Sequence, residues 1–436
     1  MRMAENNLTG STHAENLLEQ ILQPDNLNAA FKRVKRNKGA GGVDKMRVDD
    51  LRLYLTENKD RLIAELQMGN YRPQPVRRVE IPKENGKKRQ LGIPTVVDRV
   101  IQQAITQVLT PIYEEQFSTH SYGFRPKRIA HQALEQSRRY ISEGYEYAVD
   151  MDLEKFFDTV NQSKLIEVLS RTIKDGRVIS LIHKYLQAGV QISHKFELTE
   201  IGVPQGGPLS PLLSNIMLHE LDKELEARGH RFVRYADDMI VLCKSERAAT
   251  RTMSSLTRFI EDHLYLKVNR EKSVVATVTE VKFLGFSFDR IKGEGTVRLH
   301  SKSVTKLKHR IKELTSRSNG WSVEYRKAKL KQYITGWVNY FKPAVMEKLL
   351  LQIDGWYRRR LRMLIWKQWK KVRTRSMNLI KLGINRFTAW EHANSRKGAW
   401  RVALSHILAT SITNARLRQS GYLFLTDYYL SMRSAT

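Results

Sequence analysis

The stretch Phe232–Cys243 reads FVRYADDMIVLC and sets two adjacent carboxylates, Asp237 and Asp238, between two apolar runs. Runs rich in Val and Ile are typical of β-strands, and an Ala-Asp-Asp centre is typical of a tight turn. We therefore expect a β-hairpin with both acids at its tip. Neighbouring like charges stay ionised only when they are solvated or when a cation lies between them. A solvated turn and a Mg²⁺ site, which uses oxygen ligands, are both open interpretations of this pair.

A second acid-bearing segment, Tyr145–Asp158, reads YEYAVDMDLEKFFD. Its alternation predicts a strand with Asp150 and Asp152 on one face, followed by a helix-like segment from Phe156. Either acid could join the hairpin pair as a third metal ligand. The alternative is an ordinary surface acid at the end of a strand.

The stretch Gly202–Asn215, GVPQGGPLSPLLSN, predicts a glycine loop that opens a helix running from Pro208 to Leu225. Gly206 and Gly207 allow the backbone to approach a ligand closely. Upstream, two β-prone runs flank Asn85-Gly86, which is a good hairpin signal. Lys83 and Arg89 flank this hairpin and could face one polyphosphate together, or they are surface cations with no common task.

The remaining segments are mostly helical in pattern. The expected helices begin near Glu15 and Ala29 and cover 98–109 (ended by Pro111), 130–140, 164–186 and 247–264. Arg125, in the turn SYGFRP, is a residue for packing or for phosphate positioning. The basic, glycine-rich stretch 35–45 is a linker or a phosphate contact, and it lacks the ending of a nucleotide P-loop.

The charge balance points to a polyanionic partner. Lys and Arg number 75 against 45 Asp and Glu, which gives a formal net charge of +30. From Ser301 onward there are 29 basic and 6 acidic residues, so +23 of this charge lies in the last 136 residues. No apolar stretch approaches the roughly 20 residues of a membrane span. A single cysteine, Cys243, excludes an internal disulfide and a multi-cysteine zinc site.

Within the basic third, the run 355–371, GWYRRRLRMLIWKQWKK, interleaves aromatic residues with cations. Cations neutralise phosphates, and aromatic rings or Arg planes stack on unpaired bases. An amphipathic helix with its aromatics in the core is the alternative, and the two interpretations can hold for opposite faces. At 436 residues, the chain is expected to form two or three domains.

An acid-bearing strand, a Gly-Gly loop and an acid-tipped hairpin, in this order, suit templated nucleotidyl transfer, where two divalent ions about 4 Å apart act on the reacting oxygens. YADD at 235–238 and PQGGPLSPLLSN at 204–215 are hallmarks of reverse transcriptases. GFRP at 123–126, LGIPTVVDRVIQQAI at 91–105 and DLEKFFD at 152–158 narrow the match. Over roughly residues 15–430 the chain resembles group II intron reverse transcriptase/maturases, especially the compact bacterial kind of group IIC introns.

The resemblance implies an α+β fold, a right-hand polymerase with fingers and palm (an antiparallel sheet plus helices) followed by an α-helical thumb or maturase X domain. The expected division is a disordered N-terminus at 1–14, an N-terminal extension and start of the fingers at 15–80, fingers and palm at 81–295, and thumb/maturase at 296–436. Phe283–Phe288, FLGFSF, resembles the hairpin that grips the primer.

The resemblance also assigns residues. The catalytic, metal-binding acids are Asp152, Asp237 and Asp238, with Asp150 as a neighbour. Nucleotide contacts are expected at Lys83, Arg89, Phe157, Gln205 and Lys272, and Phe157 would lie under the incoming sugar and disfavour ribonucleotides. Template, primer or RNA contacts are expected at Arg125, Gly206, Tyr235, Leu284, Gly285, Arg358, Arg359, Arg360 and Arg362.

The implied function is an RNA-directed DNA polymerase that uses Mg²⁺ (or Mn²⁺) and serves its intron as a splicing and mobility cofactor. The expected partners are intron RNA, an RNA template with a DNA or RNA primer, dNTPs and target DNA, with no membrane and no zinc. We expect a monomer or weak dimer in the bacterial cytosol, associated with the nucleoid as a ribonucleoprotein. An HNH endonuclease, which larger relatives hold around zinc, is not expected in a sequence that stops at Thr436 with one cysteine.

Two other functions fit parts of this pattern. One is an RNA-binding maturase that has lost polymerase activity, although the intact acids speak against it. The other is a reverse transcriptase used in defence or diversification, against which the long basic C-terminal region speaks.

Overall fold

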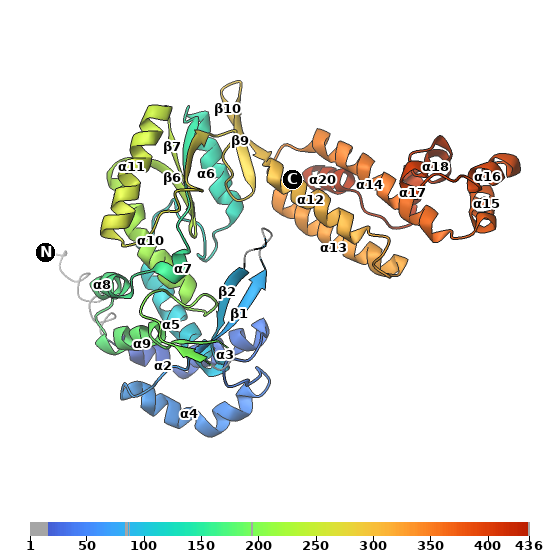
Figure 1. Cartoon of the computed structure of the whole chain (residues 1–436). Coiled ribbons are helices and arrows are strands. Elements are labelled where there is room, and N and C mark those ends of the chain that lie inside the picture. Colours follow the sequence, from blue (N-terminus) through green and yellow to red (C-terminus); the bar gives the residue numbers. More distant parts are fainter. Residues whose placement is uncertain (1–15, 83–85, 87, 193–194, 435–436) are drawn as a thin grey trace. The chain divides into compact units, whose positions relative to one another are not determined.

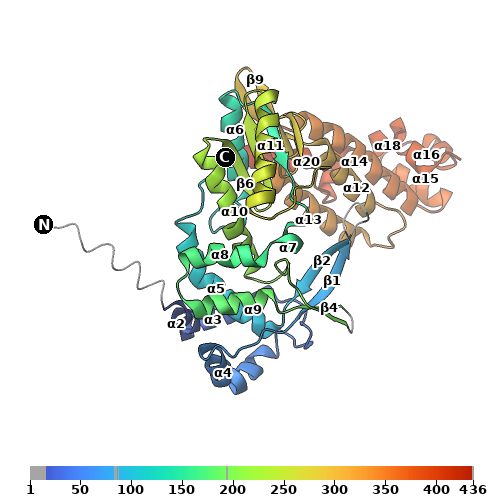
Figure 2. The ribbon, with the colours of Figure 1, turned by 60° about the vertical axis from the view of Figure 1, so that its left-hand side comes forward.

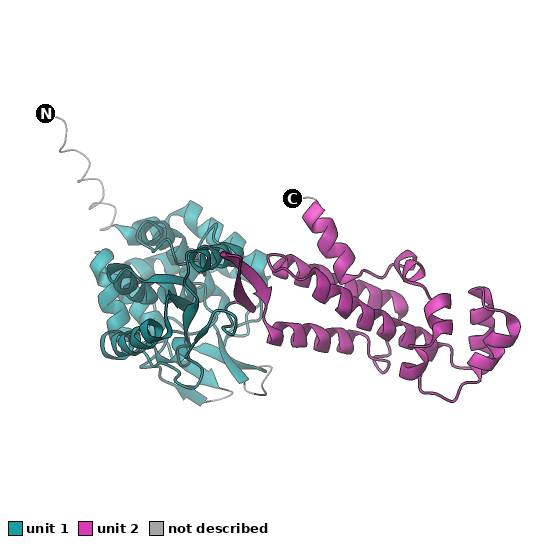
Figure 3. Cartoon of the chain, turned by 90° about the horizontal axis from the view of Figure 1, so that it is seen from above, with its two compact units in different colours: residues 1–283 teal, residues 284–436 magenta. Residues whose placement is uncertain are grey.

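The computed structural model describes residues 16–82, 86, 88–192 and 195–434. Lys83 and the N-terminal segment 1–14, for which we made predictions, lie outside the described residues. The chain divides into two compact units, unit 1 (Met1–Phe283) and unit 2 (Leu284–Thr436), coloured separately in Figure 3. Unit 1 combines sheets and helices, and unit 2 is mostly helical, so the expected α+β class with a helical C-terminal region is confirmed. The finer domain boundaries stay predictions.

The sheet that carries the acids has the strand order β6-β7-β3-β8. Its strands are β3 (Tyr147–Met151), β6 (Arg231–Tyr235), β7 (Asp238–Cys243) and β8 (Val274–Thr277). All three pairings are antiparallel, and β3 lies between β7 and β8. Residues of β3 and β7 are almost wholly apolar, and Val149 and Val241 are fully buried. The helix α11 packs on this sheet, as Figures 1 and 2 both show.

A second sheet of unit 1 has the order β2-β1-β4-β5. Its strands are β1 (Val76–Pro82), β2 (Lys88–Ile93), β4 (Val190–Ile192) and β5 (Lys195–Glu197). The antiparallel pairing of β1 with β2 confirms the hairpin predicted around Asn85-Gly86. The pairing of β1 with β4 is parallel, which the sequence did not indicate.

The described part of unit 1 also contains helices. They are α2 (Leu17–Leu22), α3 (Pro24–Asn37), α4 (Leu51–Gln67), α5 (Val96–Glu114), α6 (Ala130–Ser142), α7 (Phe156–Thr159), α8 (Gln162–Thr172), α9 (Gly176–Leu186), α10 (Ser210–Ala227) and α11 (Glu246–His263).

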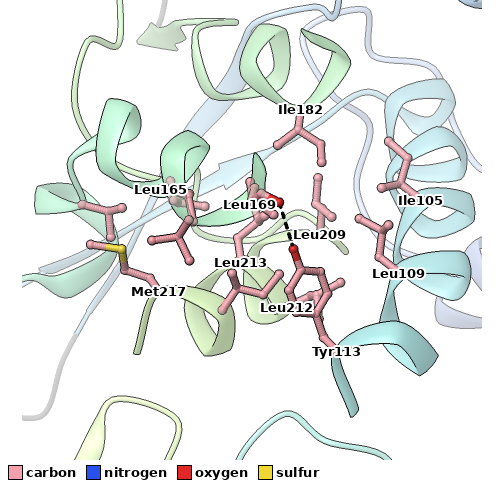
Figure 4. Close-up of a cluster of buried hydrophobic side chains, with 14 of the residues drawn as sticks. Ile105, Leu109, Tyr113, Leu165, Leu169, Ile182, Leu209, Leu212, Leu213 and Met217 are labelled. Carbon is pink, nitrogen blue, oxygen red and sulfur yellow. Dashed lines mark hydrogen bonds between the residues drawn. The ribbon is translucent and has the colours of Figure 1, made fainter. Parts of the chain in front are cut away.

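The prediction that Pro111 ends its helix is wrong, because α5 continues through it to Glu114. Proline removes one backbone hydrogen bond and usually interrupts a helix. Here Leu109 and Tyr113, on either side of the proline, are both buried in the core shown in Figure 4. The hydroxyl of Tyr113 also donates to the carbonyl oxygen of Leu169, 3.5 Å away. Tertiary packing therefore outweighs the local preference of Pro111.

The expected helical stretch over 164–186 forms two helices, α8 and α9, with a break at 173–175. Asp175 caps α9, where its Oδ1 accepts from the backbone N–H of Arg177 at 3.0 Å. Its Oδ2 accepts from the N–H of Leu18 at 3.0 Å. A carboxylate that caps one helix and holds another element stabilises the break between the two helices.

Unit 2 begins with a hairpin of β9 (Phe286–Ile291) and β10 (Glu294–Leu299). Its helices are α12 (Ser301–Leu314), α13 (Val323–Phe341), α14 (Glu347–Gln368), α15 (Val372–Lys381), α16 (Arg386–Ala393), α17 (Ala399–Val402), α18 (His406–Ser411), α19 (Asn414–Gln419) and α20 (Leu425–Ser434). The long helices enclose a separate core that includes Leu307, Ile334 and Tyr357. Among the helices of the described residues, none is both long enough and apolar enough to cross a bilayer.

Candidate active site

The two acids of the opening stretch lie at the tip of the hairpin β6–β7, as predicted. Tyr235 pairs with Asp238 across the hairpin, which leaves Ala236 and Asp237 as the two turn residues. Ala236 has a φ of 58°, a left-handed backbone conformation that few non-glycine residues adopt. A two-residue hairpin turn requires a positive φ at its first position, so this conformation follows from the turn itself.

A buried arginine lies directly beneath this turn. Arg234 is 1% exposed, and its Nε donates to Oδ1 of Asp222 at 2.7 Å. Its Nη1 donates to the carbonyl oxygen of Ala236 at 2.9 Å and to Oδ1 of Asn215 at 3.0 Å. This network was not predicted from the sequence. Its signal is a basic residue within an otherwise buried strand, which requires a buried partner.

The GFRP turn packs against the same hairpin. Asn215 Nδ2 donates to the carbonyl oxygen of Gly123 at 2.8 Å. A Cβ atom at Gly123 would lie only 2.1 Å from the backbone nitrogen of Ala236, so glycine is required for this approach. Asn215 therefore joins the GFRP turn, the helix α10 and the acid-bearing hairpin.

Arg125 was expected to position phosphate or to pack, and its contacts favour packing. The side chain is 3% exposed, and its Nε donates to Oε1 of Glu114 at 3.0 Å. Its Nη1 donates to the carbonyl oxygen of Ser121 at 2.9 Å, and the guanidinium lies 5.3 Å from the ring centroid of Phe117. All of these partners are within the protein, so the side chain does not present its donors to RNA.

One cleft of unit 1, of about 1190 Å³, brings the expected active-site residues together. The described site residues that line it are Asp152, Asp237, Asp238, Arg89, Phe157, Gln205 and Lys272. They come from the end of β3, the hairpin turn, β2, α7, the PQGG loop and the segment after α11. Segments separated by more than a hundred residues therefore meet around the three acids.

Two carboxyl groups in or beside this cleft have raised pKa values. Surrounding protein atoms displace part of the water around Asp238, and this loss of hydration raises its pKa to about 6. The negative charges of Asp237 and Asp152 add to the rise. Burial raises the pKa of Asp150 to about 7, again with help from Asp238 and Asp152. The positive charge of Lys282 opposes both shifts. Carboxylates that raise one another's pKa are a site where a cation is stabilising.

The donor chemistry of the cleft fits a divalent cation that prefers oxygen. In this structure Lys272 Nζ lies 3.3 Å and 3.4 Å from the two carboxylate oxygens of Asp152. Among the described residues, no three His, Cys, Asp or Glu side chains form a ready coordination cluster. Asp152, Asp237 and Asp238 nevertheless share the cleft, and each offers oxygens of the kind that Mg²⁺ takes together with water and phosphate. Lys272 is thus the cation nearest to the carboxylate of Asp152 among the contacts described.

The glycine loop is joined to the strand that carries Arg89. The backbone N–H of Gly92 donates to the carbonyl oxygen of Gln205 at 2.7 Å. Gly206 has a φ of 129°, and a Cβ atom there would lie 2.4 Å from the carbonyl oxygen of Gly92. The loop and β2 thus form one continuous wall of the cleft. Tyr235, the last residue of β6, is half-buried beside the turn.

Leu284 and Gly285, which were expected to contact template or primer, belong to unit 2. Leu284 and Gly285 form a turn with φ values of 52° and 86°. Tyr340 donates its hydroxyl to the carbonyl oxygen of Leu284 at 3.0 Å, and Ser303 Oγ donates to that of Gly285 at 2.6 Å. These contacts fix the turn to α12 and α13.

The four arginines of α14 make contacts inside unit 2. Arg359 Nη2 donates to the carbonyl oxygen of Trp400 at 3.0 Å, and its guanidinium lies 3.9 Å from the indole centroid. Arg360 Nη2 donates to the carbonyl oxygen of Thr315 at 3.2 Å, and Arg362 Nε donates to that of Ile412 at 2.9 Å. Arg358 lies over the ring of Phe424.

The aromatic residues of the same run divide between two environments. Tyr357 and Trp366 are buried in the core of unit 2, whereas Trp356 and Trp369 are only partly buried. The packing interpretation of the run 355–371 therefore holds for the first two. RNA contacts from this helix stay a prediction.

Comparison with known proteins identifies two family regions. Residues 81–288 match the family described as reverse transcriptase (RNA-dependent DNA polymerase), and residues 304–383 match the maturase-specific domain of group II introns. The chain is 35% identical over 318 residues to protein YkfC of Escherichia coli K12, which covers 64% of this chain and 82% of that protein.

A second relative is the group II intron-encoded protein LtrA of Lactococcus lactis. It is 32% identical over 353 residues, which covers 66% of this chain and 58% of LtrA. Among solved structures, an apo telomerase from Candida tropicalis is similar over 52% of this chain and 55% of that chain, at 16% identity and a TM-score of 0.40. That similarity is too low to carry an argument. The two family regions and the relative covered over most of its length show that the chain belongs to the reverse transcriptases with a group II intron maturase domain.

Proposed function

We propose that the cleft of unit 1 extends a primer with deoxynucleotides along an RNA template, and that the chain also binds its intron RNA as a splicing and mobility cofactor. The observation that carries the proposal is the meeting of Asp152, Asp237 and Asp238 with Arg89 and Gln205 in one cleft. Phosphoryl transfer depends mainly on positioning and on neutralising charge, and this set of residues supplies both.

The three carboxylates would hold Mg²⁺, for which Mn²⁺ can substitute, and when bound the metal lowers the pKa of the primer 3′-hydroxyl and neutralises the triphosphate. Arg89 would bind the triphosphate, together with Lys83. Gln205 would contact the nucleotide from the glycine loop. Lys272, released from Asp152, becomes a cation available to the triphosphate or pyrophosphate.

Phe157 would exclude ribonucleotides, because it lines the same cleft as Asp152 and Gln205. Residues 81–295 would then act as fingers and palm, and residues 296–436 as thumb and maturase domain. Gly206, Tyr235, Leu284 and Gly285 would contact template or primer. The substrates would be an RNA template with a DNA or RNA primer, dNTPs and target DNA.

The maturase role is supported by the family match at 304–383 and by the concentration of positive charge after Ser301. A polyanionic RNA is the partner that such a surface attracts. Binding and splicing assays with a group II intron RNA would test this part separately from polymerisation.

The test of the polymerase is primer extension on an RNA template with Mg²⁺. We expect cDNA from the unaltered protein and a loss of about a thousandfold or more with Asp237→Asn. Asp262→Asn is the matched control, because Asp262 is an exposed acid on α11 outside the residues that line the cleft. If the unaltered protein binds intron RNA but makes no cDNA with Mg²⁺ or Mn²⁺, the chain is an RNA-binding maturase and the polymerase proposal fails.

A further inference from the structure

The backbone of Phe157 is held by the loop that precedes the PQGG glycines. The N–H of Val203 donates to the carbonyl oxygen of Phe157 at 2.7 Å. The N–H of Gly202 donates to the carbonyl oxygen of Val160 at 2.8 Å. Two consecutive residues of the loop therefore bind the short helix α7, one at its second residue and one at the residue that follows its end.

Only glycine allows the loop to come this close. Gly202 has a φ of 94°, and a Cβ atom there would lie 2.9 Å from the carbonyl oxygen of Phe157. The same Cβ would lie 3.0 Å from the carbonyl oxygen of Asp158. Real Cβ atoms do not approach backbone oxygens so closely, so any side chain at Gly202 pushes the loop and α7 apart.

Gln162 fixes the loop from the other side. This side chain is 4% exposed, and its Nε2 donates to the carbonyl oxygen of Gly202 at 3.0 Å. The same nitrogen lies 3.1 Å from the carbonyl oxygen of Leu186 and 3.3 Å from that of Thr199. One buried amide thus joins α8, the end of α9 and the loop at Gly202.

Side-chain packing alone does not fix the ring of Phe157. The ring packs edge-on against the buried Phe156, with centroids 5.2 Å apart. Phe157 also lines both the catalytic cleft and a second hollow of about 190 Å³, which Gly202 and Gln205 line as well. Because open space lies on two sides of the residue, its backbone anchor determines how far the ring reaches into the cleft.

We propose that Gly202 and Gln162 are positioning residues that set the selectivity for deoxynucleotides over ribonucleotides through Phe157. This inference rests on the proposed function, in which Phe157 excludes the 2′-hydroxyl. A displacement of α7 by a few tenths of an ångström changes the room left for one hydroxyl group. Gly202 and Gln162 therefore act on substrate choice without touching the substrate.

The experiment compares kcat/KM for dATP and ATP in single-nucleotide extension by the full chain. Gly202→Ala should lower the preference for dATP by roughly tenfold, the scale of a small steric change in a pocket. Gly229→Ala is the matched control, because Gly229 has a φ of 69° and nothing within 4 Å of its Cβ position. It carries a similar backbone strain without the contact and should leave the preference unchanged.

Two further variants make the test decisive. Phe157→Val should itself relax the preference, and adding Gly202→Ala to it should cause no further change, because both act through one ring. Gln162→Met should relax the preference in the same direction, and it serves if Gly202→Ala does not fold. If Phe157→Val leaves the preference unchanged, the proposed role of Phe157 fails. If Phe157→Val relaxes it but Gly202→Ala and Gln162→Met lower dATP and ATP use equally, this inference is overturned.

Discussion

Arg234 and Ala236 are joined by a hydrogen bond of 2.9 Å from the guanidinium Nη1 to the carbonyl oxygen of the residue that begins the catalytic turn. The same guanidinium is paired with Asp222, which is fully buried. The buried ion pair of Arg234 with Asp222 thus supports the turn that carries Asp237 and Asp238. Arg234 supports the position of both acids, although it is not among the residues that line the cleft.

Removing one partner of this pair should be strongly destabilising. Arg234→Met leaves the charge of Asp222 buried without its partner, which costs about 3–5 kcal/mol. Urea denaturation of the full chain measures the loss. Arg270→Met is the control, because the ion pair of Arg270 with Glu261 is exposed and contributes about 1 kcal/mol or less. Equal losses in the two variants would contradict the structural role of Arg234.

The buried carboxyl group of Asp98, in the first turn of α5, should make the stability of the protein depend on pH. Asp98 accepts hydrogen bonds of 2.7 Å from the hydroxyl groups of both Tyr71 and Thr95. Burial raises the pKa of Asp98, although these hydrogen bonds oppose the rise. A raised pKa in the folded state means that its contribution to stability is full below the unfolded value of about 4 and is lost as the pH rises through the folded value.

Asp98→Asn removes this titration. The free energy of unfolding of the unaltered protein minus that of Asp98→Asn should therefore fall steadily as the pH is raised from about 4 through the raised pKa. Urea denaturation at a series of pH values gives the difference, in which titrations common to both proteins cancel. A difference that stays constant or grows with pH would show that the pKa of Asp98 is not raised in the folded protein.

Measurements of stability and of RNA binding can show which arginines of α14 pack within unit 2 and which bind RNA. Arg360 and Arg362 donate to backbone carbonyl oxygens of unit 2, so Arg360→Gln and Arg362→Gln should each destabilise the chain by about 1–3 kcal/mol. Lys367 and Lys370 are exposed at the end of the same run, and Lys→Gln there should leave stability unchanged. Thermal unfolding and RNA binding are measured on the same samples. If the two arginine variants lose RNA affinity at full stability, these side chains bind RNA and do not hold the fold.

The formal charge of +30 should make RNA binding depend steeply on salt. Each neutralised phosphate releases counterions, so contacts to six or more phosphates lower the affinity by about a thousandfold between 50 and 200 mM salt. Titration of intron RNA by fluorescence anisotropy at several salt concentrations measures the slope. An affinity that does not change over this range would contradict a basic binding surface.

Local patterns were enough to predict the strand around Asp150 and the hairpin that carries Asp237 and Asp238. The alternation around Asp150 and the Ala-Asp-Asp turn define strands and a hairpin from neighbouring residues alone, and the structure forms both. The choice between Asp150 and Asp152 needed the family resemblance, because β3 ends at Met151 and both acids lie near Asp238.

Features that depend on distant contacts were missed. Pro111 lies inside a helix because buried side chains on both sides of it pack into the core. The hydrogen bonds from Arg234 to Asp222 and Asn215 form only when α10 packs against β6. The sequence of α14 also does not reveal that the carbonyl groups of Thr315 and Ile412 accept from Arg360 and Arg362. Each miss concerns a partner far away in the chain.

The proposed polymerase adds deoxynucleotides directed by RNA and uses Asp152, Asp237 and Asp238 as its catalytic acids. Its most direct test is single-turnover extension of a primer on an RNA template of mixed sequence, with one dNTP supplied at a time and Mg²⁺ present. We expect addition of the complementary dNTP alone, and a loss of about a thousandfold or more in Asp152→Asn while the affinity for the primer–template is retained. Extension by Asp152→Asn at the rate of the unaltered protein would contradict this expectation.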